Sequence, residues 1–178
     1  MPGGVRGRGL AAPSYSIYAR LKENVPSLIG LKVMDGDARW YREMNRYAKG
    51  LAVFVPGHHL ATGISMGAHG SYSNVACLHP EAAQIWYRLM LTDLQEALSW
   101  EQRIRAFMEQ HIAPFVREKG YSNQAVDKLL AAVGGWCRVG TRLRWPYRGI
   151  PEEEAGRIRS HAIAMLPEAF SSRMQNIG

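Results

Sequence analysis

Lys32 is the residue of this chain whose type and position best suit covalent chemistry. It follows the apolar segment 25–29 and precedes a turn that contains Asp35 and Asp37. A lysine at the carboxyl end of a short apolar strand can be desolvated, which lowers the pKa of its amine and leaves a neutral nucleophile. Such an amine condenses with a ketone or aldehyde to a Schiff base. The alternative is a surface lysine that extends into solvent and pairs with Asp35 or Asp37.

Two further groups of polar residues end apolar segments. Gly57, His58 and His59 follow the apolar segment 51–55, and Tyr72 and Ser73 end the segment 70–73. The two imidazoles are suited to recognising an anionic group or to transferring protons, unless one of them caps the helix that follows. Ser73 can donate a hydrogen bond and Tyr72 can offer its carbonyl oxygen. Both can equally be ordinary interior residues.

The pattern of apolar residues predicts an alternation of strands and helices, followed by helices alone. Strands are expected over 28–33, 51–55 and 70–73, and helices over 14–24, 37–47 and 59–66. After Pro80 the expected helices cover 81–91, 93–119 with a break at Pro114, 122–133, and a last helix that Pro151 opens. Strands that alternate with helices indicate a parallel sheet, so the predicted fold class is α/β.

The order of these segments resembles the C-terminal part of the dihydrodipicolinate synthase / N-acetylneuraminate lyase family of class I aldolases. The matching segments are Gly30-Leu31-Lys32 with Gly36-Asp37, residues 53–59, residues 67–75 with Pro80, and Arg144-Trp145-Pro146 with residues 151–154. Together they extend from about Tyr15 to Phe170.

The resemblance implies the C-terminal portion of a (β/α)8 TIM barrel, with about three βα units and a helical extension. We expect a disordered Gly/Arg-rich tail over 1–13, the partial barrel over 14–80, and C-terminal helices over 81–178. A complete barrel needs about 250 residues, whereas this chain has 178.

The resemblance also implies a function, that of a lyase or aldolase that acts on pyruvate or a related 2-oxo acid. By family position, Lys32 would form the Schiff base, while Gly57, His58 and His59 would contact the distal part of the substrate. Tyr72 and Ser73 would contact the keto acid. This chemistry needs neither a metal nor another cofactor.

Other parts of the family site have no counterpart in this sequence. The family binds the pyruvate carboxylate with a Thr/Ser pair in an early loop, and it relays protons through a tyrosine upstream of the lysine. Tyr15 and Tyr18 lie too close to Lys32 to be that tyrosine. Three interpretations follow: a truncated enzyme, a half-barrel completed by a second copy or by a separate front half, or a non-catalytic partial-barrel subunit.

Composition narrows the class of protein. The net charge is +7, and Arg138, Arg142, Arg144 and Arg148 flank Trp145 and Tyr147. Such a group can stack on nucleic-acid bases or form a packing seam or subunit contact. The family resemblance places it outside the active centre, which favours packing or a subunit contact. No apolar run is long enough to span a bilayer, and the amino-terminal segment lacks a signal-peptide core, so a cytoplasmic location is expected.

Cysteines and histidines give no sign of a disulfide framework or a metal site. Cys77 and Cys137 are too few for such a framework, and we expect both to be reduced thiols in or near the core. His58, His59, His69 and His79 lack the spacing of zinc ligands.

Overall fold

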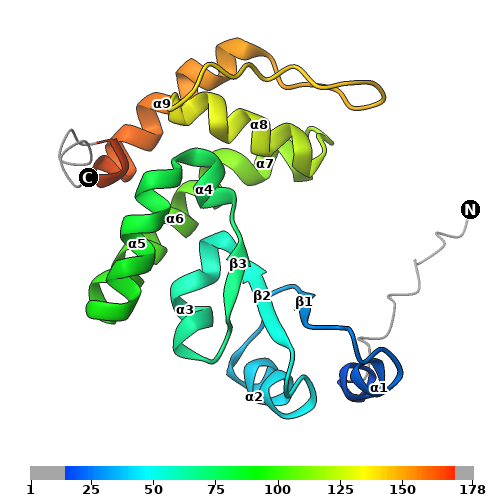
Figure 1. The fold of residues 1–178 in the computed structure, drawn as a ribbon. Helices are drawn as coiled ribbons and strands as arrows, with labels where there is room; N and C mark the ends of the chain where they lie inside the picture. Colours follow the sequence, from blue (N-terminus) through cyan, green and yellow to red (C-terminus); the bar gives the residue numbers. More distant parts are fainter. Residues whose placement is uncertain (1–14, 171–178) are drawn as a thin grey trace, which may run out of the picture.

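A short parallel sheet forms the centre of the first half of the molecule. The computed structural model describes residues 15–170, so the predicted tail over 1–13 and the first residue of the helix predicted over 14–24 lie outside it. The strands are β1 (Gly30–Lys32), β2 (Ala52–Pro56) and β3 (Gly70–Tyr72), in the order β1-β2-β3 (Figure 1). Both pairings are parallel, which confirms the predicted sheet.

The two faces of β2 differ in what covers them. Val53 and Val55 are buried against helices, as expected for a strand that runs through a parallel sheet. Phe54, which points to the opposite face, is 39% exposed. A Cβ added to Gly70 would come within 3.0 Å of the Phe54 ring, and one added to Gly30 within 3.3 Å, so this ring lies over the two glycines of the neighbouring strands. The sheet therefore has one covered face and one open face.

Helices of the βα units form where the sequence predicted them, with small shifts at their ends. They are α1 (Ser16–Asn24), α2 (Ala38–Tyr47) and α3 (Leu60–Ser65), the last preceded by the 3₁₀ turn η1 (Gly57–His59). The Asp37 carboxylate accepts from Trp40 N at 2.8 Å and so caps α2 as predicted. Tyr41 and Met44 of α2 are buried.

The rest of the described chain is helical. Its elements are α4 (Asn74–Leu78), α5 (Pro80–Thr92), α6 (Leu94–Phe107), η2 (Met108–Ile112), α7 (Ala113–Arg117), α8 (Asn123–Gly134), α9 (Glu152–Met165) and η3 (Pro167–Phe170). The short α4 was not predicted. The break expected at Pro114 begins earlier, because α6 widens into the π-helical turn η2 before the proline, which has no N–H to donate. Gly135 ends α8 in the left-handed conformation, with φ of 68°.

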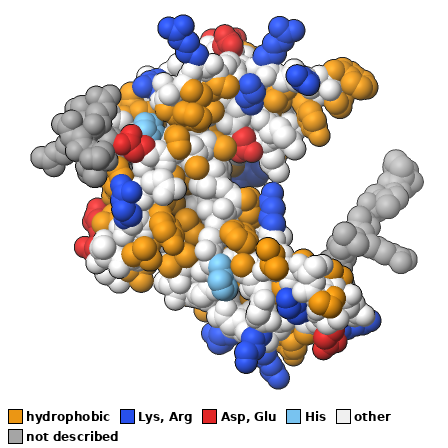
Figure 2. All heavy atoms as spheres, in the orientation of Figure 1, with side chains coloured by type: hydrophobic (Ala, Val, Ile, Leu, Met, Phe, Trp, Pro, Cys, Tyr) orange, Lys and Arg blue, Asp and Glu red, His pale blue; other side chains and the backbone are white. Residues whose placement is uncertain are grey.

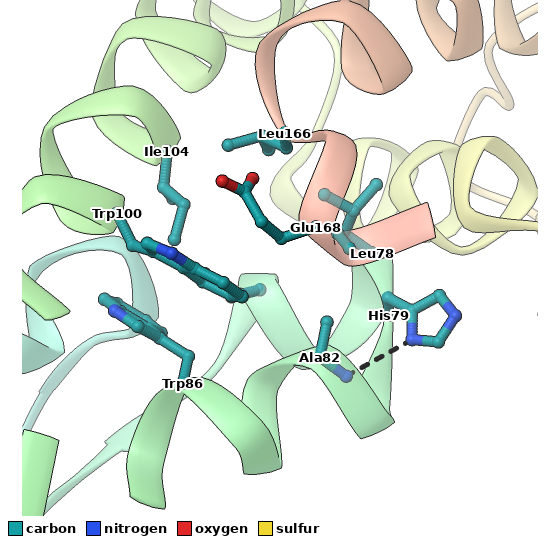
Figure 3. A pocket seen from close by; sticks show the side chains of 10 residues that line it. Leu78, His79, Ala82, Trp86, Trp100, Ile104, Leu166 and Glu168 are labelled. Carbon is teal, nitrogen blue, oxygen red and sulfur yellow. Dashed lines mark hydrogen bonds between the residues drawn. The ribbon is translucent and has the colours of Figure 1, made fainter. Parts of the chain in front are cut away.

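An apolar cavity lies where η3 packs on α5 and α6. Trp86, Trp100 and Ile104 face Leu166 across it (Figure 3). Its volume of about 20 Å³ holds about one water molecule. Arg103 donates to both carboxylate oxygens of Glu168, at 2.7 and 2.8 Å, and so fixes η3 against α6. This cavity is therefore a packing seam of the helical region and not a ligand site.

The observed class agrees with the predicted one: α/β, with three parallel βα units followed by a helical extension. Within residues 15–170, no helix is both long enough and apolar enough to cross a membrane.

Candidate active site

The carboxyl ends of the three strands gather the residues that were singled out in the sequence. In the parallel register Lys32 lies opposite Phe54, and Pro56 lies opposite Tyr72. The polar residues that follow β2 and β3 therefore lie at the same edge of the sheet as Lys32. The molecule is hollowed between the sheet region and the helical region, with basic side chains bordering the hollow (Figure 2). Active sites of (β/α)8 proteins are built at this strand edge.

Lys32 is exposed rather than desolvated, so that part of the prediction is wrong. The open face of the sheet leaves its amine in contact with solvent. Nζ lies 4.1 Å from the centroid of the Tyr72 ring, a cation–π contact. The predicted alternative of pairing with Asp35 or Asp37 is not observed either, because those carboxylates bind other groups.

Tyr72 connects the ends of β1 and β3. Its hydroxyl donates to the Val33 carbonyl oxygen at 2.9 Å. Burial, and then the nearby charge of Asp35, raise the pKa of this phenol. The ring therefore stays neutral and presents its π face to the Lys32 amine.

Asp35 is the centre of a hydrogen-bonded cluster beside the sheet. Its Oδ1 accepts from the Tyr41 hydroxyl at 2.5 Å, and its Oδ2 lies 2.6 Å from His59 Nδ1. The side chains of Asp35 and His59 are each 18% exposed. Burial raises the pKa of Tyr41 far above the usual range, and the hydrogen bond to Asp35 and the negative charge of Asp35 raise it further. Burial lowers the pKa of His59, although the Asp35 charge opposes this.

The 2.6 Å contact with Asp35 favours one tautomer of neutral His59. A neutral imidazole beside a carboxylate places its proton on the facing nitrogen, here Nδ1. Nε2 is then an acceptor, so His59 has the arrangement of a general base that a carboxylate orients.

His58 has the opposite arrangement. The amide Nδ2 of Asn74 lies 2.8 Å from His58 Nδ1 and donates to it, which leaves the proton of a neutral ring on Nε2. Burial, and then the charge of His59, lower the pKa of His58 to about 4. The two rings meet edge to face with centroids 4.4 Å apart. A neutral donor and a neutral acceptor thus lie side by side at neutral pH.

Gly57 and Ser73 each have a structural role at the strand ends. A Cβ at Gly57 would come within 2.7 Å of both the Ser73 Cα and the Asn74 Oδ1, so the ends of β2 and β3 approach closely only with glycine there. Ser73 Oγ accepts from Ala76 N at 2.9 Å and caps α4. The expectation that His58 or His59 caps the following helix is wrong, since no side-chain cap bond forms there.

A cleft opens beside the two histidines. It has a volume of about 550 Å³. His58, His59 and Asn74 line it from the strand ends, and Arg105 of α6 and Asn123 of α8 line it from the helices. The Arg105 charge contributes to the lowered pKa values of both histidines.

Asp127 of α8 provides a second link between the helices and the strand ends. Burial raises the pKa of its carboxyl, and the Lys32 charge opposes that rise. Asp127 therefore lies near enough to Lys32 for their charges to attract each other.

The structure also describes residues outside this edge. Among residues 15–170 there is no group of three or more potential metal ligands. Both cysteines are free thiols, but Cys137 is exposed and not near the core as expected. Arg148 packs on the Tyr121 ring at 4.3 Å, whereas Trp145 is 92% exposed and has no packing role within the described chain.

Sequence reasoning missed four residues of this region: Asp35 as the partner of His59, Tyr41, Asn74 and Arg105. Asn74 directly follows the strand predicted over 70–73, and Asp35 lies two residues after the strand predicted over 28–33, so their positions carried a usable signal. Arg105 lies in the middle of a helix far along the chain, and nothing in its local sequence sets it apart.

Comparison with known proteins gives structural neighbours only. The sequence matches no protein-family model and no curated protein. YagE of E. coli, a prophage protein of the dihydrodipicolinic acid synthase family solved with pyruvate, aligns with a TM-score of 0.67 and 18% identity over 85% of this chain and 51% of its own. Dihydrodipicolinate synthase from Agrobacterium tumefaciens aligns with a TM-score of 0.62 and 22% identity over 88% of this chain and 50% of its own.

A Sulfolobus solfataricus 2-keto-3-deoxygluconate aldolase variant, solved with L-2-keto-3-deoxy-galactonate, gives a TM-score of 0.66 at 16% identity, over 88% of this chain and 51% of its own. The chain therefore spans about half the length of the structures it matches. This likeness confirms the predicted fold, the C-terminal part of a barrel of this kind.

Proposed function

We propose that this chain carries the Schiff-base lysine of a lyase or aldolase that acts on pyruvate or a related 2-oxo acid. The observation that supports this most is the position of Lys32 at the carboxyl end of β1, in a fold shared with a protein solved with pyruvate. The mouth of a (β/α)8 barrel is where such chemistry takes place.

The proposed reaction begins with the Lys32 amine. In its neutral form the amine attacks the C2 carbonyl carbon of the 2-oxo acid, and the carbinolamine loses water to give an iminium. Loss of a proton from C3 then gives an enamine, which adds to the carbonyl carbon of a second substrate. Water finally releases the product and restores the amine. In the reverse direction the iminium accepts the electron pair of the breaking C–C bond.

Neighbouring residues have proposed roles in this sequence. The Tyr72 ring holds the amine at the strand end by the contact of 4.1 Å. His59, oriented by Asp35, is the candidate group for moving the C3 proton through Nε2. Gly57 and His58 would contact the distal part of the substrate, and the Ser73 hydroxyl can still donate to the keto acid while its oxygen caps α4.

Formation of the adduct, rather than turnover, is the appropriate test. The family's carboxylate cradle and its relay tyrosine have no counterpart among these residues, whereas attack by Lys32 on a carbonyl needs only the amine. Incubation with pyruvate followed by borohydride reduction traps the iminium as a secondary amine, which intact mass and peptide mapping locate.

We expect one adduct, on the peptide that contains Lys32, formed only when pyruvate and reductant are both present. The variant Lys32→Ala should not form it, whereas Lys49→Ala, which alters an exposed lysine next to the start of β2, should form it normally. A folded sample that gives no adduct, or labels its lysines indiscriminately, would contradict the proposal.

A second candidate, a non-catalytic partial-barrel subunit, is supported by the open face of the sheet. Phe54 is 39% exposed there and Lys32 is also exposed, and open sheet surfaces favour association. Under this alternative the chain forms a stable complex with a second copy or with a separate front half. Sedimentation over a range of concentrations tests self-association, and a strictly monomeric protein would count against a homo-oligomer.

A further inference from the structure

The cleft beside His58 and His59 is also lined by Arg105 and Asn123, which have no role in the proposed Schiff-base chemistry of Lys32. Its walls come from the strand ends and from four consecutive elements of the helical region, α6, η2, α7 and α8. Its volume of about 550 Å³ lies within the range of small-molecule sites. The site is therefore large enough for part of a substrate.

Arg105 provides the cleft's uncompensated positive charge. Its side chain is exposed in the cleft, and no carboxylate of the described residues forms an ion pair with it. Glu109 also lines the cleft, but its carboxylate is 2.7 Å from Arg117 Nη2 and is thus neutralised. Arg105 consequently remains available to pair with an anionic ligand.

The two histidines add directional groups to this charge. His58 accepts from Asn74 through Nδ1, so its Nε2–H is free to donate. His59 is oriented by Asp35 and is neutral at pH 7. A neutral imidazole donor binds an anion without the cost of desolvating a second cation. Asn123 offers a further amide from α8.

The remaining walls of the cleft are apolar. They are formed by side chains of η2, α7 and α8, among them Met108, Ile112, Val116 and Val126. A ligand that fits has a short carbon chain against this wall and a charged group at its end. A planar guanidinium binds carboxylate and phosphate through two parallel hydrogen bonds.

We propose that this cleft binds the anionic end of the second substrate, a phosphate monoester or a carboxylate, with Arg105 as its charged ligand and His58 as a neutral donor. The proposal rests on the proposed function in calling this ligand the second substrate. Anion binding itself depends only on the cleft.

The binding test uses inorganic phosphate and malonate as probes of the two chemistries. Protein with ¹⁵N-labelled histidine is titrated with each anion at constant ionic strength, and the imidazole resonances of His58 and His59 are followed by NMR. We expect saturable shifts of both, with the stronger response identifying phosphate or carboxylate as the preferred group. Arg105→Gln should weaken this binding about tenfold or more. Arg105→Lys should weaken it less, because lysine keeps the positive charge and loses only the paired hydrogen bonds of the guanidinium group.

A matched control separates local binding from overall charge. Arg88→Gln removes one positive charge from an exposed position on α5, outside the cleft, and should leave the titration unchanged. Equal weakening by Arg88→Gln and Arg105→Gln would overturn the proposal, as would the absence of saturable shifts with both anions.

The variant Lys32→Ala distinguishes the two proposals. It should bind phosphate or malonate like the natural protein while forming no pyruvate adduct. If adduct trapping fails but Arg105-dependent anion binding is found, the lyase proposal falls and the anion site remains. If trapping succeeds and anion binding is absent, the anion site is wrong and Lys32 keeps its role.

Discussion

The sheet region and the helical region of this molecule differ in how completely their apolar surfaces are covered. In the helical region Trp86, Phe107 and Leu129 are at most 1% exposed. In the sheet region one face is buried through Val53 and Val55, while Phe54 on the other face is 39% exposed. The candidate reactive groups lie at the edge of the less covered region.

The candidate site lies on the less covered region, so polar contacts rather than a surrounding apolar core must fix the positions of its side chains. Polar contacts hold the groups in place: Asp35 orients His59, Asn74 orients His58, and the Tyr72 ring contacts Lys32. The buried helical core supports the far wall of the cleft, where Arg105 lies opposite the strand ends. Stability and chemistry are thus expected to respond to different substitutions.

The largest expected effect is in the helical core. Trp86 is 1% exposed and its indole donates to the Ala97 carbonyl oxygen at 2.9 Å. Trp86→Ala removes a large buried side chain together with its hydrogen bond to Ala97, and should lower the free energy of unfolding by about 4 kcal/mol. Urea denaturation measures this.

Trp145→Ala is the control for the same change of side chain at an exposed position. Trp145 is 92% exposed, so its loss should change stability by about 0.5 kcal/mol or less. A cost at Trp145 close to that at Trp86 would mean that something covers Trp145 in solution.

The next effect concerns the connection between the two regions. Glu101 of α6 is 2% exposed and accepts from both the backbone N–H and the hydroxyl of Thr62 in α3. Glu101→Ala leaves two donors unpaired and should cost about 3 kcal/mol. Glu96→Ala, at an exposed position of the same helix, should cost about 0.5 kcal/mol or less.

A double-mutant cycle tests whether this contact couples the regions. If it does, Thr62→Val combined with Glu101→Ala should cost clearly less than the sum of the two single changes. Strictly additive costs would show that the two side chains act independently.

The elements were predictable where local chemistry decides them. Asp37 caps α2 and Gly135 ends α8, because a side-chain acceptor and a left-handed glycine are local requirements. The position of Lys32 at the end of β1 also followed from the apolar pattern.

Features that depend on distant packing were not predictable. The exposure of Lys32 depends on what covers the sheet face, and the pairing of Asp35 with His59 joins residues that are far apart in the sequence. Arg105 reaches the histidines from a helix whose placement depends on the whole helical region. Burial of a lysine cannot be inferred from strand pattern alone.

A smaller effect is the pH dependence that His58 contributes. Its pKa is lowered from 6.5 to about 4, so between these values the unfolded chain takes up a proton that the folded chain does not. The contribution of His58 to the free energy of unfolding is therefore fully present above about pH 6.5. It falls by about 2 kcal/mol as the pH is lowered to about 4. Unfolding free energies measured by urea denaturation across this range should show the decline.

His58→Asn removes this titration while keeping a polar side chain. Its stability should decline less between pH 6.5 and 4 than that of the natural protein, by the share that His58 contributes. The lowered pKa values of His59 and His79 leave part of the decline in place. Identical pH profiles for both proteins would show that His58 is accessible to protons in the folded state.

The smallest effect compares the two faces of β2 directly. Val55 is 0% exposed and Phe54 is 39% exposed, so Val55→Ala should cost about 2 kcal/mol and Phe54→Ala about 1 kcal/mol, although phenylalanine is the larger residue. Urea denaturation at two protein concentrations about a hundredfold apart provides the measurement. If the face is open, the cost at Phe54 is the same at both concentrations. If a second copy covers it, that cost rises with concentration, because association stabilises only the protein that retains the ring. A concentration-dependent cost would therefore remove the contrast between the two regions and favour the partial-barrel subunit.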